Sequence, residues 1–448
     1  MATELNKQSK ILVLGGGTWG CSTALHLARR GYTNVTVLDA HPIPSPISAG
    51  NDVNKIIDSS LGCFTDGDDE AAVAQTLLNA ANQGWENDPV FKPYYHDTGY
   101  IVAGSTPESI ERLVEREIRH HNPDSFKKLT TAEDFKGTMP KGVLTGDFPG
   151  WEGYYKSSGA GWVHARKALV SCYNEAKRLG VSFITGSPEG KVTSLIHQDG
   201  DVRGATTADD EQHLADRTIL ALGANAPQLL DFENQLRPTA WTLGHIPMTD
   251  EETKLYKNLP VLFNIEKGFF MEPDEDKHEL KLCDEHPGYC NWVTTPGSAL
   301  PQSVPVAKHE VPVPSERRMR EFLREVVPHL AERPFTFARM CWCADTPNRA
   351  FLITYHPRLK SLVVAAGDSG HGFMHIPSIG GFIVDCVEGK LEDKFARSWR
   401  WRPETAREFW GHDKLDRFGA GNKMLDLKET ETEGWTRISG LGADGLVV

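Results

Sequence analysis

The strongest constraint on the fold lies at the start of the chain. An apolar run of strand length, Lys10–Leu14, leads into the glycine-rich turn Gly15–Gly20, and apolar residues then follow at helical spacing. A second apolar run, Val35–Leu38, ends at Asp39. A strand, a glycine-rich turn, a helix and a second strand make one βαβ unit of the size that dinucleotide-binding folds use. The sequence therefore predicts a nucleotide cofactor beside this turn.

Each glycine of the G-x-G-x-x-G pattern in this turn has its own physical role. Gly15 permits the tight turn, Gly17 lets the backbone approach a pyrophosphate, and Gly20 lets the helix pack closely on the strand. Asp39 ends the second strand, where a carboxylate can accept a hydrogen bond from a ribose hydroxyl. A glycine-rich turn in an unrelated α/β protein is the alternative, but the strand, the helix and the acidic residue around it favour cofactor binding.

Composition excludes several other classes of protein. The 448 residues carry 48 Lys+Arg and 61 Asp+Glu, for a net charge of −13, which argues against a general binder of nucleic acid or of anionic membranes. No stretch reaches about 18 uninterrupted apolar residues, and the polar start has no signal-peptide core. We therefore expect a cytoplasmic location. The 8 cysteines are scattered, so neither a disulfide framework nor a metal site is expected.

Segments typical of a nucleotide-binding fold are separated along the chain. Strand-like runs recur at 181–184, 192–196 and 218–222, and a second glycine-rich turn occupies 367–372. Residues 68–145 mix helical patterns with polar loops, and 240–335 are polar and proline-rich. We expect a nucleotide-binding domain interrupted by a second domain. The predicted boundaries are 1–60, 150–240 and 336–392 for the first domain, 61–149 and 241–335 for the second, and 393–448 for a tail that packs on both.

Together these residues resemble the flavin amine oxidases of the sarcosine oxidase and D-amino acid oxidase superfamily, and more closely the fructosyl amino acid oxidases, or amadoriases. The resemblance covers nearly the whole chain. Its most specific motifs are Gly15–Gly20 with Asp39, Asn51–Lys55, Leu280–Gly288, Cys341–Pro347 and Gly367–Phe373.

The resemblance implies an α/β fold, α+β overall, in which a Rossmann-like FAD-binding domain is interleaved with a mixed-sheet substrate-binding domain. It implies oxidation of the C–N bond of a glycated amino acid with O2 and water, giving glucosone, free amino acid and hydrogen peroxide. The alternative is another secondary-amine oxidase of the superfamily, and a non-catalytic flavin sensor is a more remote one. A monomer or weak homodimer is expected, and the choice between α- and ε-fructosyl substrates stays open.

Three residues acquire a role in the chemistry from the resemblance. Cys341 matches the cysteine that bonds covalently to the flavin 8α-methyl, with Cys343, or a buried free cysteine, as the alternatives. Lys281 matches the lysine that faces the flavin and activates oxygen, because a fixed cation stabilises the developing anion. Lys55 matches a basic position beside it. An exposed lysine on the surface is the alternative for both.

Two departures from sarcosine oxidase indicate the substrate. Asp58 and Met374 occupy places where that enzyme has cations for a small amino acid's carboxylate. An aspartate there would repel a carboxylate but accept hydrogen bonds from sugar hydroxyls. Glu285 is expected to bind sugar hydroxyls or the amine, with Asp284 as the alternative.

The amino-acid end of the substrate needs a cation. Arg417 resembles the family's arginine for that carboxylate, and its planar fork suits bidentate pairing. Arg112 or Arg116 could assist from the entrance, although an exposed helix face explains both without function. The remaining residues expected to surround the flavin are Thr18, Trp19, Ser48, Gly50, Val192, Gly223, Asp368, Gly370, Gly372, Phe373 and Met374.

Overall fold

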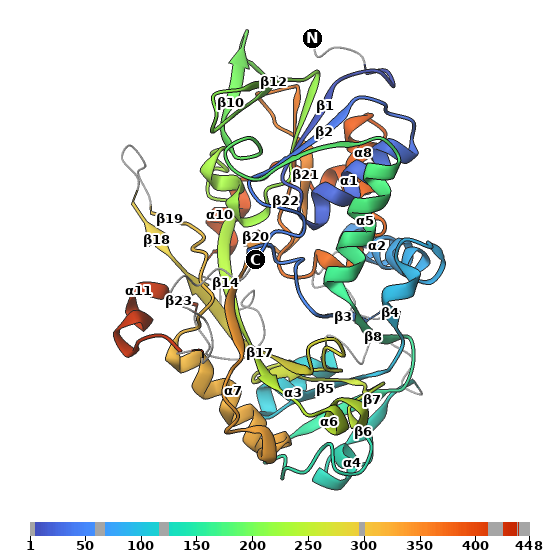
Figure 1. Ribbon diagram of the computed structural model, residues 1–448, viewed down its shortest axis with the longest axis vertical. Coiled ribbons are helices and arrows are strands. Elements are labelled where there is room, and N and C mark those ends of the chain that lie inside the picture. The colour runs from blue at the N-terminus through green and yellow to red at the C-terminus, as the bar shows by residue number, and fades with distance from the viewer. Residues whose placement is uncertain are drawn as a thin grey trace.

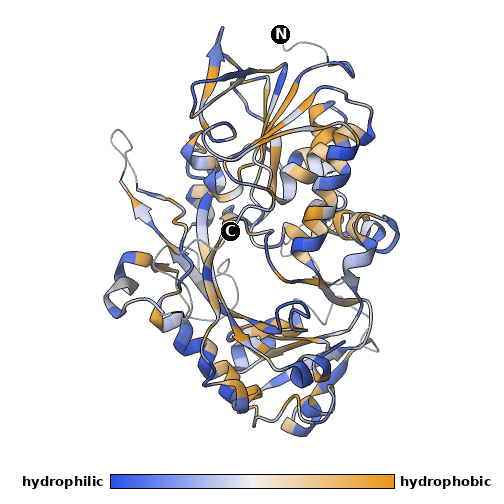
Figure 2. Cartoon of the chain, viewed as in Figure 1, coloured by the Kyte–Doolittle hydropathy of each residue, from blue (hydrophilic) through white to orange (hydrophobic). Residues whose placement is uncertain are grey.

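Two large β-sheets organise the chain, one in the upper half of the view and one in the lower half (Figure 1). The computed structural model describes residues 5–58, 68–115, 125–294, 301–410, 424–436 and 438. Figure 2 shows hydrophobic residues gathered in the strands of both sheets and hydrophilic residues along the outer faces of the helices.

The first sheet has six strands and follows from the βαβ unit at the start of the chain. Its central strand β1 (Ile11–Leu14) pairs in parallel with β2 and β13, and only the edge strand β21 runs antiparallel to its neighbour. In sheet order the strands are β21 (Leu352–Tyr355), β22 (Leu362–Ala366), β13 (Arg217–Leu220), β1, β2 (Val35–Asp39) and β9 (Ser182–Thr185).

Both faces of this sheet are covered, which explains why its strands are continuous apolar runs. Successive residues of β1 point to opposite faces. Ile11 and Val13 pack into a core with the helices, and Leu12 and Leu14 pack into a second core with a small three-stranded sheet. The helices are α1 (Thr18–Arg29), α5 (Ala165–Arg178) and α8 (Ile379–Val387), with α2 (Asp68–Asn87) and α9 (Asp393–Ser398) beside them. The small sheet contains β10 (Val192–Gln198), β11 (Asp201–Thr207) and β12 (Gln212–Leu214).

The second sheet is a mixed, nine-stranded one. Along its path run β20 (Phe337–Asp345), β14 (Arg237–Pro247), β17 (Glu279–Cys290), β16 (Gly268–Phe270), β15 (Val261–Asn264), β5 (Tyr100–Gly104), β7 (Glu152–Lys156) and β6 (Lys127–Leu129), while β23 (Leu425–Asp426) pairs with β17. One face packs on α7 (Val313–Val326) and α4 (Ala132–Lys136). The helices α3 (Pro107–Leu113) and α6 (Asp250–Leu255) lie in the same half of the molecule (Figure 1).

Smaller elements complete the described chain. A three-stranded sheet contains β3 (Lys55–Asp58), β8 (Ala160–Val163) and β4 (Tyr95–His96), and a two-stranded one contains β18 (Trp292–Val293) and β19 (Gln302–Ser303). The last helices are α10 (Glu404–Phe409) and α11 (Leu427–Thr430). Among the described helices, none has the length and apolar character that a membrane crossing needs.

The predicted fold class is confirmed, and the first βαβ unit forms where the sequence placed it. Two strands lie differently from what the predicted boundaries imply. Both β7 and β20 fall inside stretches assigned to the nucleotide-binding domain, but they pair within the nine-stranded sheet. The helical and loop reading of 68–145 also missed β5, whose five residues are all buried. A mixed sheet was expected in the second domain, but the bounds of its strands were not predicted, because polar residues interrupt their apolar pattern, as in Glu279–Cys290.

Candidate active site

The first glycine-rich turn has the geometry that its residues predict. Gly15 has φ +101°, and a Cβ there would lie 2.6 Å from the Ala221 carbonyl oxygen. A Cβ on Gly20 would lie 1.8 Å from the Gly15 carbonyl oxygen, so only glycine allows α1 to approach β1 this closely. Gly17 precedes α1 without a side-chain cap, which leaves the first N–H groups of the helix available to an anion.

Asp39 ties this turn to the end of β2. Its carboxylate accepts hydrogen bonds from the backbone N–H of Gly16 at 2.7 Å and of His41 at 2.9 Å. Burial raises its pKa, and the two N–H groups oppose that shift. Gly223 opens the 3-10 turn that follows β13, and Val192 begins β10. These residues therefore lie around the carboxyl ends of the parallel strands, the edge at which α/β sheets bind ligands.

The second glycine-rich turn joins parts of the chain that are distant in sequence. The Asp368 carboxylate accepts hydrogen bonds from the N–H of Ala344 at 2.8 Å and of Gly370 at 3.2 Å. The indole N–H of Trp19, on α1, donates to the Gly372 carbonyl at 3.2 Å. The indole N–H of Trp85, on α2, donates to the Met374 carbonyl at 2.7 Å. The turn is thus fixed to β20, α1 and α2 together.

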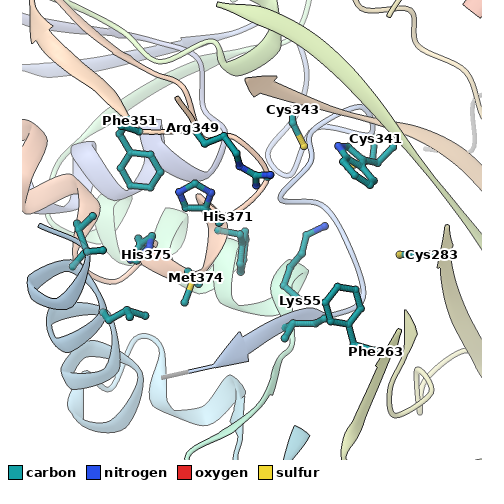
Figure 3. A pocket seen from close by; sticks show the side chains of 18 of the residues that line it. Lys55, Phe263, Cys283, Cys341, Cys343, Arg349, Phe351, His371, Met374 and His375 are labelled. Atoms are coloured by element: carbon teal, nitrogen blue, oxygen red, sulfur yellow. The ribbon is translucent and has the colours of Figure 1, made fainter. Parts of the chain in front are cut away.

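A large cavity opens between these turns and the second sheet. In Figure 3 the side chains of Lys55, from β3, and of Cys341 and Cys343, both from β20, extend into it, and His371 and Met374 lie on its other side. The residues of its wall on which the argument depends are Asp52, Lys55, Trp241, Phe263, Cys283, Glu285, Cys341, Cys343, Arg349, Gly370, His371, Phe373 and Met374.

Strand alternation explains how the second sheet lines this cavity. Trp241 pairs with Cys341, and Leu243 pairs with Cys283 on one side and with Arg339 on the other. Paired residues share a face of the sheet, and every second residue of a strand returns to it. Cys341 and Cys343 therefore both face the cavity, and each is about as well buried, at 8% exposure. The opposite face carries Leu282 and other core residues that pack on α7.

The central feature of the site is a buried carboxylate between two lysines. The Asp52 carboxylate accepts hydrogen bonds from Lys281 Nζ at 2.7 Å and from Lys55 Nζ at 2.5 Å. Lys281 also donates to the Asn54 carbonyl at 2.9 Å. Both Asp52 and Lys281 are 3% exposed. We call this arrangement the lysine–aspartate cluster.

The charges of this cluster outweigh the cost of burial. Burial by itself would raise the pKa of Asp52, but Lys281, Lys55 and Arg339 hold the pKa of that carboxyl well below its usual range. Burial would likewise lower the pKa of Lys55, but Asp52 outweighs it and raises that pKa. Asp52 is therefore an anion and Lys55 a cation at neutral pH.

Arg339 adds a third cation to this region. Its side chain is buried, and Nη1 donates to the carbonyls of Pro46 and Ser48, each at 3.2 Å. Its Nη2 has no hydrogen-bond partner among the described residues. A buried, unpartnered guanidinium N–H is costly, so the site is built to receive a polar group there. Arg339 was not identified from the sequence.

The predicted substrate residues are only partly brought together. Glu285 lines the cavity, and Met374 lies on its wall. Asp58 is buried and pairs with Lys156 at 3.4 Å, so the acidic charge expected in the pocket is offset by a nearby lysine, and Asp58 is not part of the wall. Arg112 lies on α3 and does not border the cavity either. Arg116 and Arg417 lie outside the described residues.

Several cavity residues were not singled out by sequence reasoning. Asp52 stands inside the motif Asn51–Lys55, but a lone aspartate gives no sign of which lysines it will meet in the fold. Arg349 belongs to the wall and donates through Nη2 to the Ser369 carbonyl at 2.9 Å. In the sequence, only its position two residues after the motif Cys341–Pro347 could have pointed to Arg349.

Comparisons with known proteins agree with this geometry. Residues 10–386 match the family model described as DAO, FAD dependent oxidoreductase. A curated relative, L-saccharopine oxidase from Schizosaccharomyces pombe, is 29% identical over 413 residues, which cover 88% of this chain and 93% of that protein.

Two solved structures are more similar in sequence. Fructosyl amine: oxygen oxidoreductase (Amadoriase I) from Aspergillus fumigatus is 56% identical with a TM-score of 0.94, covering 98% of this chain and 100% of that one. The deglycating enzyme fructosamine oxidase (Amadoriase II) from Aspergillus fumigatus, in complex with FSA, is 52% identical with a TM-score of 0.93, covering 97% and 98%.

The fold, the two glycine-rich turns and the family match define an FAD-dependent oxidoreductase. Within that family the chain belongs to the amadoriases, which confirms the resemblance of its sequence motifs.

The lysine–aspartate cluster should contribute measurably to the free energy of unfolding. Asp52→Asn leaves the buried ammonium group of Lys281 and the half-buried one of Lys55 without their anion, so we expect the free energy of unfolding at neutral pH to fall by about 3–5 kcal/mol. Because the folded-state pKa of Asp52 is depressed, its contribution is present above the unfolded pKa of about 4 and is lost as the pH falls through the folded value.

Urea denaturation at several pH values measures this difference. The gap between wild type and Asp52→Asn should be largest near neutrality and should narrow in acid. The exposed pair of Glu133 and Lys136 offers a control, since Glu133→Gln should change little. Equal stabilities of Asp52→Asn and wild type at neutral pH would contradict the assignment.

Proposed function

We propose that this protein oxidises fructosyl amino acids at the C–N bond of their secondary amine, using FAD and O2. The products are glucosone, the free amino acid and hydrogen peroxide. The observation that carries the proposal is the lysine–aspartate cluster, which places a buried ammonium group beside the cavity that Glu285 and two cysteines line. The identity of over half of the aligned residues to two Aspergillus fumigatus amadoriases supports the same substrate class.

The residues present fit FAD. Gly15 and Gly20 keep the turn free of side chains at positions where a Cβ would collide with backbone, and Asp39, which binds the Gly16 N–H, would accept a hydrogen bond from the ribose. The unpartnered Nη2 of Arg339 is a ready donor to an electron-rich group of the cofactor. When bound, FAD accepts the hydride equivalent of the substrate and passes two electrons to O2.

Lys281 is proposed to stabilise the negative charge that develops on oxygen. A fixed cation in a water-poor site is far more effective than one in water, and it needs no rearrangement during the reaction. Asp52 and the Asn54 carbonyl hold the ammonium group in place. Lys55 shares Asp52 and completes the cluster from β3.

The substrate is proposed to bind with its sugar toward Glu285. A carboxylate accepts hydrogen bonds from hydroxyl groups, which a fructosyl moiety supplies and sarcosine lacks. Met374 offers no charge for a small amino acid's carboxylate. The cations on the described wall are Lys55 and Arg349, and Arg349, which also donates to the Ser369 carbonyl, is proposed to bind the substrate's own carboxylate. Arg417 stays a prediction for that role.

The flavin is further proposed to be covalently linked through Cys341. For the link to form, the 8α-methyl would lose a proton, the Cys341 sulfur would bond to the resulting methylene carbon, the flavin would take up the two electrons, and O2 would return it to the oxidised state. Cys341 lines the cavity together with Lys55. Cys343 faces the same cavity and is the alternative. The monomeric or weakly dimeric state and the cytoplasmic location stay predictions.

The two cysteines can be separated by substitution. We expect Cys341→Ala to lose the covalent flavin and Cys343→Ala to retain it, because Cys341 is the cysteine that matches the motif of the family. Mass spectrometry of the denatured proteins measures the mass of the bound flavin directly. Covalent flavin on Cys341→Ala together with its loss from Cys343→Ala would reassign the link.

A substrate panel tests the proposed activity. Peroxide release should be seen with fructosyl-valine or ε-fructosyl-lysine, and the response to sarcosine and to saccharopine should be lower by about 10²-fold or more in kcat/KM, because neither supplies a sugar to Glu285. A protein without a flavin spectrum, or one that releases peroxide only with sarcosine or saccharopine, would overturn the proposal.

A further inference from the structure

A break in strand pairing shapes the part of β17 that carries Glu285. Ala240 pairs with Tyr289 and Thr242 pairs with Asp284, so β14 advances two residues while β17 advances five. The residues between Asp284 and Tyr289 therefore bulge out of the ladder. Bulges of this kind redirect a side chain away from the regular pleat, and they recur next to active sites. We call residues 285–288 the Glu285 bulge.

One arginine on α7 contacts both ends of this bulge. Arg318 Nη2 donates to the Asp284 carboxylate at 2.7 Å and to the Tyr289 hydroxyl at 2.6 Å, and Nε donates to both Asp284 oxygens at 3.1 Å. It also donates to the Ser315 hydroxyl at 3.1 Å. Asp284 is 2% exposed and Tyr289 is 1% exposed. Asp284 borders the cavity, and Arg318, which is not part of the cavity wall, holds its carboxylate from α7.

The bulge is also braced internally. The N–H of His286 donates to Asp284 at 3.1 Å, and the His286 ring stacks on Tyr289 with centroids 5.6 Å apart. Gly288 has φ +104°, and a Cβ there would lie 2.7 Å from the Ala240 carbonyl oxygen. These contacts hold the backbone of β17 in place where it leaves the strand pairing and where it returns to it.

We propose that Arg318 is a positioning residue for substrate recognition: by pinning Asp284 and Tyr289, it fixes the bulge that aims Glu285 into the cavity. A carboxylate recognises a polyhydroxylated group only if it is held at one position, and a displacement of about 1 Å can cost about 10²-fold in rate. Arg318 itself belongs to α7, on the far side of the sheet, and touches no substrate. This inference rests on the proposed function.

The proposal predicts different effects on substrate binding and on the reaction with O2. Arg318→Met removes the hydrogen bonds that Arg318 makes to both ends of the bulge, so the KM for a fructosyl amino acid should rise by about 10- to 100-fold. Reoxidation of the reduced flavin by O2 should stay near the wild-type rate, because Lys281 and Asp52 keep their contacts. The preference for a fructosyl amino acid over sarcosine should fall in parallel with the rise in KM.

Two further variants keep the test decisive if Arg318→Met folds poorly. Tyr289→Phe removes one hydroxyl and should raise the KM about two- to tenfold, as expected for one hydrogen bond. Arg318→Lys should raise the KM less than Arg318→Met does, because a lysine can still contact Asp284.

Arg324→Met is the matched control, because Arg324 lies on the same helix and pairs with Glu332 instead of the bulge. Melting temperatures of all variants, measured on the holoenzyme, show whether the fold is intact. A KM for Arg318→Met and Tyr289→Phe equal to that of Arg324→Met would overturn the proposal, as would equal losses in both half-reactions. If wild type itself releases no peroxide with any glycated amino acid, the proposed function fails instead.

Discussion

The pairing of Asp52 with Lys281 connects the two halves of the molecule. Asp52 precedes β3, on the side of the first sheet, and Lys281 belongs to β17 of the second sheet. Neither charge could be buried alone, because an isolated ion loses several kcal/mol of hydration on burial. Each half of the molecule therefore supplies the partner that the other needs. The same contact fixes an ammonium group at the edge of the cavity, so the interaction that joins the halves also builds the site.

The two sheets divide the work of the protein. The parallel sheet, buried on both faces, ends in glycine-rich turns whose backbone stays open to a cofactor. The mixed sheet packs one face on α7 and turns its other face, with Cys341 and Trp241, toward the cavity. The chain is 29% identical to L-saccharopine oxidase and over half identical to two amadoriases. The cofactor side follows from the backbone of the turns, and in the proposed function specificity follows from individual residues such as Glu285.

The sequence predicted the parts of the structure that depend on local rules. The turn Gly15–Gly20 and its helix follow from steric limits on neighbouring residues. Cys341 could be singled out because it belongs to a recognisable sequence motif, Cys341–Pro347. The bounds of the strands in the second sheet could not be predicted in the same way, because these strands carry charged residues among apolar ones. Asp52 and Arg318 were missed for a related reason. Each acquires its role from partners distant in sequence, and no local pattern announces a buried ion pair.

The central claim is that Lys281, held by Asp52, serves the reaction with oxygen and not the oxidation of the substrate. Stopped-flow measurement of both half-reactions in Lys281→Met tests it most directly, with substrate mixed anaerobically in one experiment and O2 mixed with the reduced enzyme in the other. We expect reoxidation to slow by about 10²–10³-fold, as when one preorganised stabilising group is removed, while flavin reduction stays near the wild-type rate. Equal losses in the two half-reactions, or an unchanged rate with O2, would contradict the account.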